Sequence, residues 1–289
     1  MPSTQRNKVA IQGAILATTA ALLTSLLMAI AKALPAAIPS SLLLFIRSLF
    51  VLIFSLPLWV RNPQSALKSD QYALHGLQVI LGIGATLCTY YTYRTLPVTL
   101  ATSLGMTGAL FTTVLSVLIL KDDVDFIKWA CILIGYAGAL LIIQPQTISL
   151  ETGILTALLA NLLAGFGSII SKILSQRVDK SAIIVYNTVG LSIFFGFLSY
   201  PHWYLLNQQT LWILAGMGIL SLSGKYCYLT ALKKADPSFL APFEYTRLLF
   251  AFLIGFFYFH ELPNISTLVG SFLIIGATYI ITYRSKNPG

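Results

Sequence analysis

The hydrophobic pattern of this chain consists of long apolar stretches separated by short polar connections. Ten of these stretches approach the roughly 20 residues that a helix needs to cross a bilayer. They lie at about 11–31, 40–60, 72–93, 97–120, 127–145, 152–174, 181–200, 209–231, 237–259 and 264–283. Because every connection is short, no room is left for a soluble domain. The pattern therefore predicts an all-α integral membrane protein with ten transmembrane helices.

The ninth stretch contains a charged pair. The sequence APFEYTR places Glu244 and Arg247 three residues apart at the start of a segment that is otherwise nearly all apolar. A charge near the centre of a membrane helix costs on the order of 3 kcal/mol on insertion scales. Such residues usually face a bundle interior or a water-filled cavity, so the pair is a candidate functional site.

The two halves of the chain align when one is shifted by 140 residues. In the window 13–34, eight positions are identical to their counterparts, whereas the apolar composition alone gives roughly two identities. The same shift pairs Pro97 with Pro237. We therefore expect two five-helix repeats that together form one transport unit, residues 1–145 and 146–289.

The number of helices in each repeat has a topological consequence. Five is odd, so the second repeat enters the membrane with the opposite orientation to the first. Inverted repeats of this kind are typical of secondary transporters, in which the solute binds near the midplane between the repeats. Duplication for structural economy alone is an alternative interpretation, and channels and flippases are also duplicated.

Charge is scarce and unevenly distributed. Only 9% of the 289 residues are charged, against about 25% in a soluble domain, yet the net charge is +9. With the amino terminus inside, thirteen of the eighteen basic residues lie on the cytoplasmic side, and only Lys32 and Arg94 lie outside. By the positive-inside rule, this bias predicts that both termini are cytoplasmic. The net charge thus follows from topology, and no nucleic-acid partner is expected.

Several phrases resemble a known family. The segment LPVTLATSLGMTGALFTTVLSVLILKDD at 96–123 and its partner ADPSFLAPFEYTRLLFAFLIGFFYFHEL at 235–262 resemble the fourth and ninth helices of the EamA family, in the drug/metabolite transporter superfamily. Arg47 in LLLFIRSLF resembles an arginine of the second helix, and Glu261 resembles the acidic residue that closes the ninth. The AP-x-x-Y phrase and ELPNISTLVGS at 261–271 are similar to the branch that includes S-adenosylmethionine carriers.

The resemblance implies the drug/metabolite transporter fold and a multi-pass carrier in a bacterial-type inner membrane. The solutes that it brings into view are amino acids, other metabolites such as S-adenosylmethionine, and amphiphilic drugs. It identifies a scaffold better than a solute, because fold does not fix function.

A third charge is expected beside the pair. In the hairpin around Ala235, Lys225 lies ten residues before the turn and Glu244 nine residues after it, so both are predicted at a similar depth. One positive charge then lacks a fixed partner, and the carboxylate of a substrate would supply one to Arg247 or Lys225. Glu244 is also the candidate for proton coupling, because its protonation would release a cation. A structural Glu244–Arg247 pair, and a Lys225 that reaches toward the interface, are the alternatives.

Four further residues complete the predicted site. Tyr245 is adjacent to Glu244, Asn161 lies in the sixth stretch, and Tyr90 lies toward the outer end of the third. We expect all three to contribute to substrate binding, although polar and small residues in membrane helices also serve packing. Pro242 lies within the ninth stretch and removes a backbone hydrogen bond there, which makes it a candidate hinge or cavity-lining break.

The motifs of other functional classes are absent from the sequence. The three histidines are scattered and no HExxH spacing occurs, so neither an enzyme nor a metal site is expected. No GxxxxGK[ST] loop is present to couple ATP. We therefore predict a secondary transporter for a small carboxylate-bearing solute, coupled to protons or to exchange, with no cofactor. A drug exporter or lipid flippase is the alternative function, and the choice between monomer and homodimer is left open.

Overall fold

The computed structural model describes residues 3–34, 38–60, 69–96, 104–143, 152–202, 206–259 and 265–286. These residues form helices and short connections, with no β-strand among them. The helices of the first half are α1 (Ser3–Ala33), α2 (Ser40–Val60), α4 (Tyr72–Thr95), α6 (Gly108–Leu115), the π-helix η1 (Ser116–Leu120) and α7 (Phe126–Ile143). Those of the second half are α8 (Thr152–Arg177), α9 (Lys180–Ser199), the 3₁₀-helix η2 (Tyr200–His202), α10 (Gln208–Lys234), α11 (Pro237–Leu240), the 3₁₀-helix η3 (Ala241–Tyr245), α12 (Thr246–Phe259) and α13 (Ile265–Lys286).

The helices confirm the predicted all-α membrane fold. Five described segments, in α1, α2, α4, α8 and α9, are long and apolar enough on their own to cross a bilayer. The ninth predicted span differs in its detail. It is not one α-helix but the succession α11, η3 and α12, with the 3₁₀ segment centred on Phe243.

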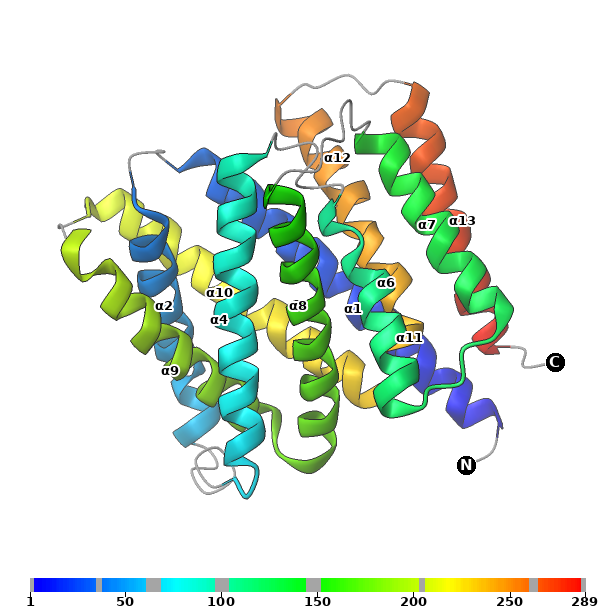
Figure 1. The fold of residues 1–289 in the computed structure, drawn as a ribbon, viewed down its shortest axis with the longest axis horizontal. Coiled ribbons are helices and arrows are strands. Elements are labelled where there is room, and N and C mark those ends of the chain that lie inside the picture. Colours follow the sequence, from blue (N-terminus) through cyan, green and yellow to red (C-terminus); the bar gives the residue numbers. More distant parts are fainter. Residues whose placement is uncertain are drawn as a thin grey trace.

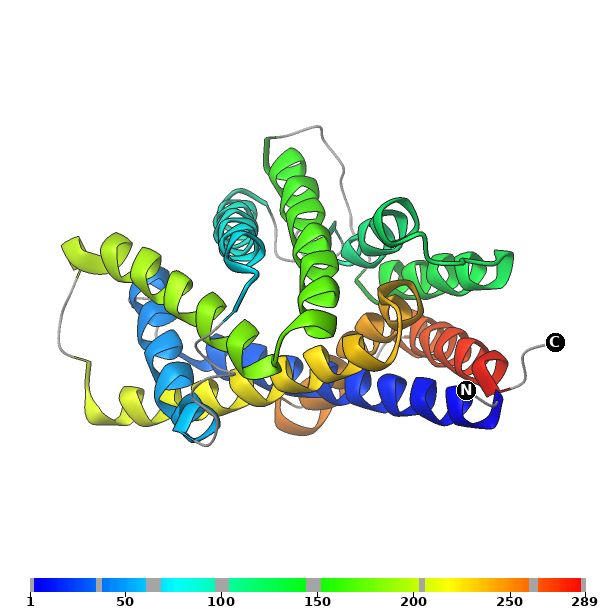
Figure 2. The ribbon, with the colours of Figure 1, turned by 90° about the horizontal axis from the view of Figure 1, so that it is seen from below.

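Contacts between helices follow the repeat. Helix α4 of the first half packs on α8 of the second. Their counterparts in the opposite halves, α10 and α1, pack on each other in the same way. The contact of α6 with α8 likewise has its counterpart in that of α12 with α1. The pairs α2 with α9 and α7 with α13 join corresponding helices and lie at opposite ends of the molecule (Figures 1 and 2). The two halves are therefore related by approximate two-fold symmetry.

The direction of the helices shows that the repeat is inverted. In Figure 1 the two chain ends lie near each other on one edge of the molecule, which we call the termini side. Helix α1 begins at the termini side, whereas its counterpart α8 ends there, at the connection to α9. The second repeat thus traverses the same layer in the opposite sense, as the odd number of helices in each repeat requires.

Polar contacts join the helices on the termini side. The ammonium group of Lys172, near the end of α8, donates to the carbonyl oxygens of Leu232 at 2.7 Å and Ala235 at 2.8 Å, and lies 3.1 Å from the carboxylate of Asp236. Lys172 is only 5% exposed, so these partners compensate the loss of its hydration. They fix the turn from which α11 begins.

A second contact on this side joins the two halves. The hydroxyl of Ser238 on α11 donates to the carboxylate of Asp122 at 2.9 Å, and Ser116 of η1 donates to the same oxygen. The π-helix ends at Lys121, whose φ of 57° is left-handed and turns the chain so that Asp122 meets α11. The ninth span is thereby held at its start by residues of the first half.

Helices α7 and α13 approach each other through two glycines. A Cβ atom placed on Gly270 would lie 2.4 Å from the carbonyl oxygen of Gly138, and one placed on Gly138 would lie 2.7 Å from the carbonyl oxygen of Gly270. No side chain fits between backbones at these distances. Small residues commonly permit such close packing of membrane helices.

We predict that Gly270→Ala destabilises the protein by about 1–3 kcal/mol, because the methyl group forces α13 away from α7. Gly276→Ala in the same helix is the matched control, since a Cβ there meets nothing within 4 Å. The midpoint of thermal unfolding in detergent should fall for the first variant and stay constant or rise slightly for the second. Equal midpoints for the two variants would contradict the close contact.

Candidate functional site

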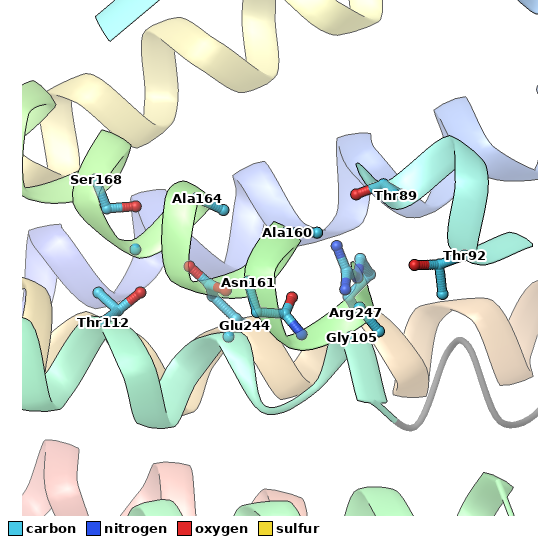
Figure 3. A pocket seen from close by; sticks show the side chains of 13 residues that line it. Thr89, Thr92, Gly105, Thr112, Ala160, Asn161, Ala164, Ser168, Glu244 and Arg247 are labelled. Atoms are coloured by element: carbon cyan, nitrogen blue, oxygen red, sulfur yellow. The ribbon is translucent and has the colours of Figure 1, made fainter. Parts of the chain in front are cut away.

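A cavity of about 250 Å³ lies between the two halves. Its wall is built by α4, by the chain around the start of α6, by α8 and by the η3–α12 junction. The residues that line it are Thr89, Thr92, Gly105, Gly108, Thr112, Ala157, Ala160, Asn161, Ala164, Gly165, Ser168, Glu244 and Arg247 (Figure 3). The lining mixes polar groups with Gly and Ala, and its side chains are small apart from those of Asn161, Glu244 and Arg247.

Helix α8 contributes one complete face to the cavity. Its lining residues fall at 157, 160, 161, 164, 165 and 168, which is the spacing of a single helical stripe. All of them are Ala, Gly, Ser or Asn. The small side chains keep α8 from filling the space that faces η3 and α12.

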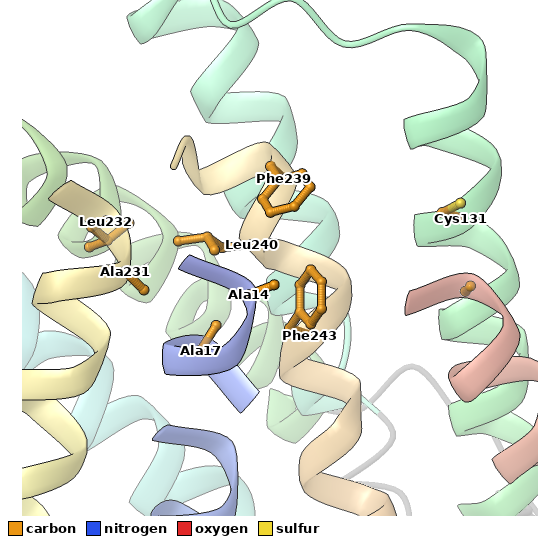
Figure 4. Packing of buried hydrophobic residues seen from close by; sticks show 9 residues of the cluster. Ala14, Ala17, Cys131, Ala231, Leu232, Phe239, Leu240 and Phe243 are labelled. Carbon is orange, nitrogen blue, oxygen red and sulfur yellow. The ribbon is translucent and has the colours of Figure 1, made fainter. Parts of the chain in front are cut away.

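Glu244 owes its position to the apolar residues around it. In η3, Ala241, Pro242, Phe243 and Tyr245 are all buried, and Glu244 is the one partly exposed residue of the segment. Figure 4 shows Phe239 and Phe243 between α1 on one side and α7 with α13 on the other. These anchors fix the rotation of η3, so the carboxylate is left facing the cavity.

The hydrophobic cluster around these phenylalanines joins five α-helices and η3. It contains Ala14, Ala17, Cys131, Ala231, Leu232, Phe239, Leu240, Phe243 and Ala277. The rings of Phe239 and Phe243 lie 5.6 Å apart between their centroids. Rotation of η3 would expose this cluster, which couples the orientation of Glu244 to the packing of the fold.

Arg247 lies on the same wall, at the start of α12. Its carbonyl oxygen accepts a hydrogen bond of 2.9 Å from the hydroxyl of Ser25, which ties α12 to α1. Figure 3 shows the side chains of Glu244 and Arg247 extending toward α8. The guanidinium group therefore reaches the cavity from a backbone that the first half holds in place.

The two charges do not pair with each other. Among the described residues, the one ion pair within 4 Å joins Lys172 and Asp236, and no hydrogen bond is made by the side chain of Glu244 or of Arg247. The close ion pair of the structural alternative is therefore not formed, although the positive charge of Arg247 is near enough to act on the carboxylate of Glu244. Glu244 belongs to a 3₁₀ segment and Arg247 to an α-helix, so the regular spacing on which that alternative depended is broken.

Asn161 is brought to the same cavity, as the sequence predicted. Its amide nitrogen donates to the carbonyl oxygen of Leu104 at 2.7 Å and to the hydroxyl of Thr107 at 3.0 Å. These two bonds fix the chain just before α6. Within the described part of the chain, its Oδ1 atom makes no hydrogen bond, so it is available to a solute.

Lys225 does not join the pair, contrary to expectation. It lies on α10, where its ammonium group donates to Oδ1 of Asn187 on α9, and it is not among the residues of the cavity wall. Two residues at equal depth on either side of a turn are neighbours only when their side chains also point toward each other. Here α10 turns Lys225 toward α2 and α9.

Tyr245 is also placed differently from the expectation. It is only 1% exposed and packs in a second cluster with residues of α6, α7, α12 and α13, such as Ala109 and Ile274. Its ring lies against Gly135, where an added Cβ would meet it at 2.6 Å. Tyr245 is a core residue because η3 rotates by about 120° per residue, which turns it away from its neighbour Glu244.

The remaining two predicted residues have different outcomes. Pro242 lies in η3, so the expected departure from α-helical geometry occurs beside it, and its role as a hinge stays a prediction. Tyr90 lies in α4, but its side chain is outside the described part of the structure.

Three threonines were not predicted as part of the site. Thr89 and Thr92 face the cavity from α4, and Thr112 faces it from α6. Beneath the wall, the hydroxyl of Tyr228 donates to that of the lining residue Ser168 at 3.0 Å. Uncharged residues of this kind occur throughout the chain, and only the stripe of small residues on α8 was a usable signal in the sequence. Within the described residues, no three His, Cys, Asp or Glu side chains cluster to hold a metal ion.

Comparisons with known proteins agree with this architecture. A family model described as the EamA-like transporter family matches the chain twice, at residues 11–144 and 151–283. The chain is 27% identical over 277 residues to a riboflavin transporter of Vibrio cholerae, a match that covers 94% of this chain and 93% of the relative. It is 28% identical over 243 residues to an S-adenosylmethionine uptake transporter of Rickettsia prowazekii, with coverage of 84% and 82%. A solved crystal structure with a TM-score of 0.81 covers 93% of this chain and 98% of its own, and its 16% identity shows the fold alone.

The cavity predicts a pattern of thiol reactivity along α8. In a chain whose three native cysteines are replaced by alanine, Ala164→Cys should react with a charged methanethiosulfonate about tenfold or more faster than Leu159→Cys. Ala164 lines the cavity, where water allows the reactive thiolate to form, whereas Leu159 is 45% exposed on a different face and contacts lipid. Modification rates measured in proteoliposomes test this. Equal rates would contradict a hydrated cavity beside Ala164.

Proposed function

The chain belongs to the EamA-like transporter family, and on this premise we propose that it carries a small zwitterionic solute through the cavity at Glu244 and Arg247. It is a multi-pass membrane protein that transports a small metabolite. The finer proposal is that the solute bears a carboxylate and a cationic group, as amino acids and S-adenosylmethionine do.

One observation carries this proposal. Glu244 and Arg247 line one wall of the cavity, and among the described residues neither charge forms an ion pair within 4 Å. Charges removed from water are expensive unless they are paired. A solute with one negative and one positive group would compensate both at once.

The chemistry of the two side chains assigns each end of the solute. The planar guanidinium of Arg247 offers parallel N–H donors that match a carboxylate. The carboxylate of Glu244 suits an ammonium or sulfonium group. Oδ1 of Asn161 and the threonine hydroxyls of α4 supply neutral acceptors and donors around them.

This assignment distinguishes between the activities named for the two relatives. S-adenosylmethionine carries both a carboxylate and cationic groups, whereas riboflavin carries neither a carboxylate nor an ammonium group. The unpaired charges therefore favour a solute of the first kind.

The cavity also favours the metabolite over the alternative of a drug or lipid. Pockets for drug-sized ligands are usually lined mainly by apolar and aromatic side chains. The wall of this cavity consists of Thr, Gly, Ala, Ser, Asn, Glu and Arg. Amphiphilic compounds would find no aromatic or large aliphatic side chain among these residues.

The arrangement of contacts fits transport by alternating access. The cavity reaches Thr92 and Ala157, near the ends of α4 and α8 that lie away from the termini side. On the termini side, the contacts of Lys172 with Asp236 and of Ser238 with Asp122 hold the helices together. Rocking of one repeat against the other would open this side and close the opposite one.

The excess of basic residues supports a topology with both termini in the cytoplasm, and the bacterial relatives support the inner membrane as the location. The termini side would then be the cytoplasmic side. Proton coupling through Glu244 is part of the proposal, because protonation would remove the partner of the cationic group of the solute.

We predict that counterflow in proteoliposomes identifies an amino-acid-like solute. We expect preloaded S-adenosylmethionine or an amino acid to drive entry of the labelled compound, and riboflavin or a cationic drug to give no exchange. Exchange of riboflavin or a drug alone would contradict the zwitterion proposal.

For the solute found in this way, Arg247→Gln should lower the apparent affinity by roughly tenfold to a hundredfold, because a charge-assisted hydrogen bond contributes about 1.5–3 kcal/mol. Arg247→Lys should retain part of the affinity, since it keeps the charge but loses the planar fork. Arg177→Gln is the matched control, because Arg177 is exposed at the end of α8. Equal losses in the Arg247 and Arg177 variants would exclude a binding role.

The pH dependence tests the role of Glu244. In the wild type, the apparent affinity should decrease as pH falls, because protonated Glu244 no longer attracts the cationic group of the solute. Glu244→Gln should give a low and pH-independent affinity. Asp179→Asn, at an exposed acidic residue before α9, should keep the wild-type profile. A Glu244→Gln variant that kept both affinity and pH dependence would remove Glu244 from the coupling step.

A further inference from the structure

A second group of charges lies within the helices, away from the cavity. Lys225 of α10 donates a hydrogen bond to Asn187 of α9, and the positive charge of Arg47 on α2 is close enough to act on Lys225. Neither cation lines the cavity at Glu244. The three residues form what we call the cationic cluster.

The helices around this cluster provide no counter-ion. Helices α2, α9 and α10 contact one another, and α4 borders Asn187 at Gly82. None of these four helices contains an aspartate or a glutamate. Of the nine acidic residues in the chain, Glu244 is the one that falls within a described helix, and it faces the cavity beside Arg247.

Both cations lie well inside their helices. Arg47 is the seventh residue after Ser40, so it lies about 10 Å from the beginning of α2. Lys225 lies nine residues before Lys234, about 13 Å along α10 from its end. Each cation thus lies about two helical turns or more from the nearer end of its helix.

The cluster is also held rigidly. Beside Arg47, the hydroxyl of Ser192 on α9 donates to that of Ser48 on α2 at 2.7 Å. Asn187 is 7% exposed and Ser48 8% exposed, so these two groups are buried, whereas Arg47 and Lys225 are partly exposed. Two like charges held together without a carboxylate repel each other. An anion between them would attract both and offset this repulsion.

We propose that Arg47, Lys225 and Asn187 form a second binding site, between α2, α9 and α10, for a small oxyanion such as a carboxylate or phosphate group. The guanidinium of Arg47 supplies paired donors, Lys225 supplies a second cation, and the amide nitrogen of Asn187 supplies a neutral donor. The site is separate from the cavity and does not depend on the proposed function.

Thermal unfolding of the full chain in lipid-free neutral detergent tests this site, with sodium acetate and sodium phosphate as probes. The wild type should show saturable stabilisation by at least one of them. Arg47→Gln and Lys225→Gln should each weaken the apparent affinity about tenfold or more. Arg177→Gln and Lys233→Gln, at exposed basic residues, should bind as the wild type does.

The variants of the cavity separate the two proposals. Glu244→Gln and Arg247→Gln should lose transport but still be stabilised by acetate or phosphate. If the wild type transports no amino-acid-like solute, the proposed function fails, but stabilisation by the anion is still expected. Equal, unsaturable salt effects in all variants would overturn the second site.

If the Arg47 and Lys225 variants fail to fold, wild-type crystals grown with bromide provide a second test. Bromide scatters anomalously and should give a peak in contact with Arg47 and Lys225. The absence of a peak there, at bromide concentrations that label surface sites, would overturn the proposal.

Discussion

The cost of holding charge away from water is the constraint on which the rest of this structure depends. A bilayer interior offers no water to a buried ion, so each ion needs a partner in the protein or in a solute. Lys172 shows the satisfied case, with two carbonyl oxygens and the carboxylate of Asp236 around its ammonium group. Glu244 and Arg247 show the opposite case, because the described residues leave both charges to the cavity. The distinction separates structural charge from charge that is kept for binding.

The inverted repeat explains how such a site is built from a nearly apolar fold. In each half, a segment that is not α-helical, residues 106–107 before α6 and η3 before α12, lies beside the first helix of the other half. In one copy, Asn161 of α8 holds the chain at Leu104, and in the other, Ser25 of α1 holds the chain at Arg247. Under the shift of 140 residues, Glu244 corresponds to Leu104 and Arg247 to Thr107. The two repeats thus share the fold and the irregular segment. They differ in the residues at these two positions, which are charged only in the second repeat.

The sequence predicted what depends on hydrophobic pattern and charge. The long apolar stretches, the repeat and the pair at Glu244 and Arg247 were visible because each departs strongly from the composition around it. The positions of Lys225 and Tyr245 were not predictable in the same way. Depth follows from counting residues, but a helix turns by about 100° per residue, so the direction of a side chain depends on how its helix packs. Packing places Lys225 beside Asn187 and buries Tyr245 against Gly135.

The central claim is that Arg247 binds the carboxylate of the solute, and a double cycle of protein and solute tests it most directly. Apparent affinities would be measured for the transported amino-acid-like solute and for its amide, in the wild type and in Arg247→Gln. The account predicts that the amide binds much more weakly than the acid in the wild type and about equally in the variant. If the variant still prefers the acid as strongly as the wild type does, Arg247 does not contact the carboxylate, and the claim is wrong.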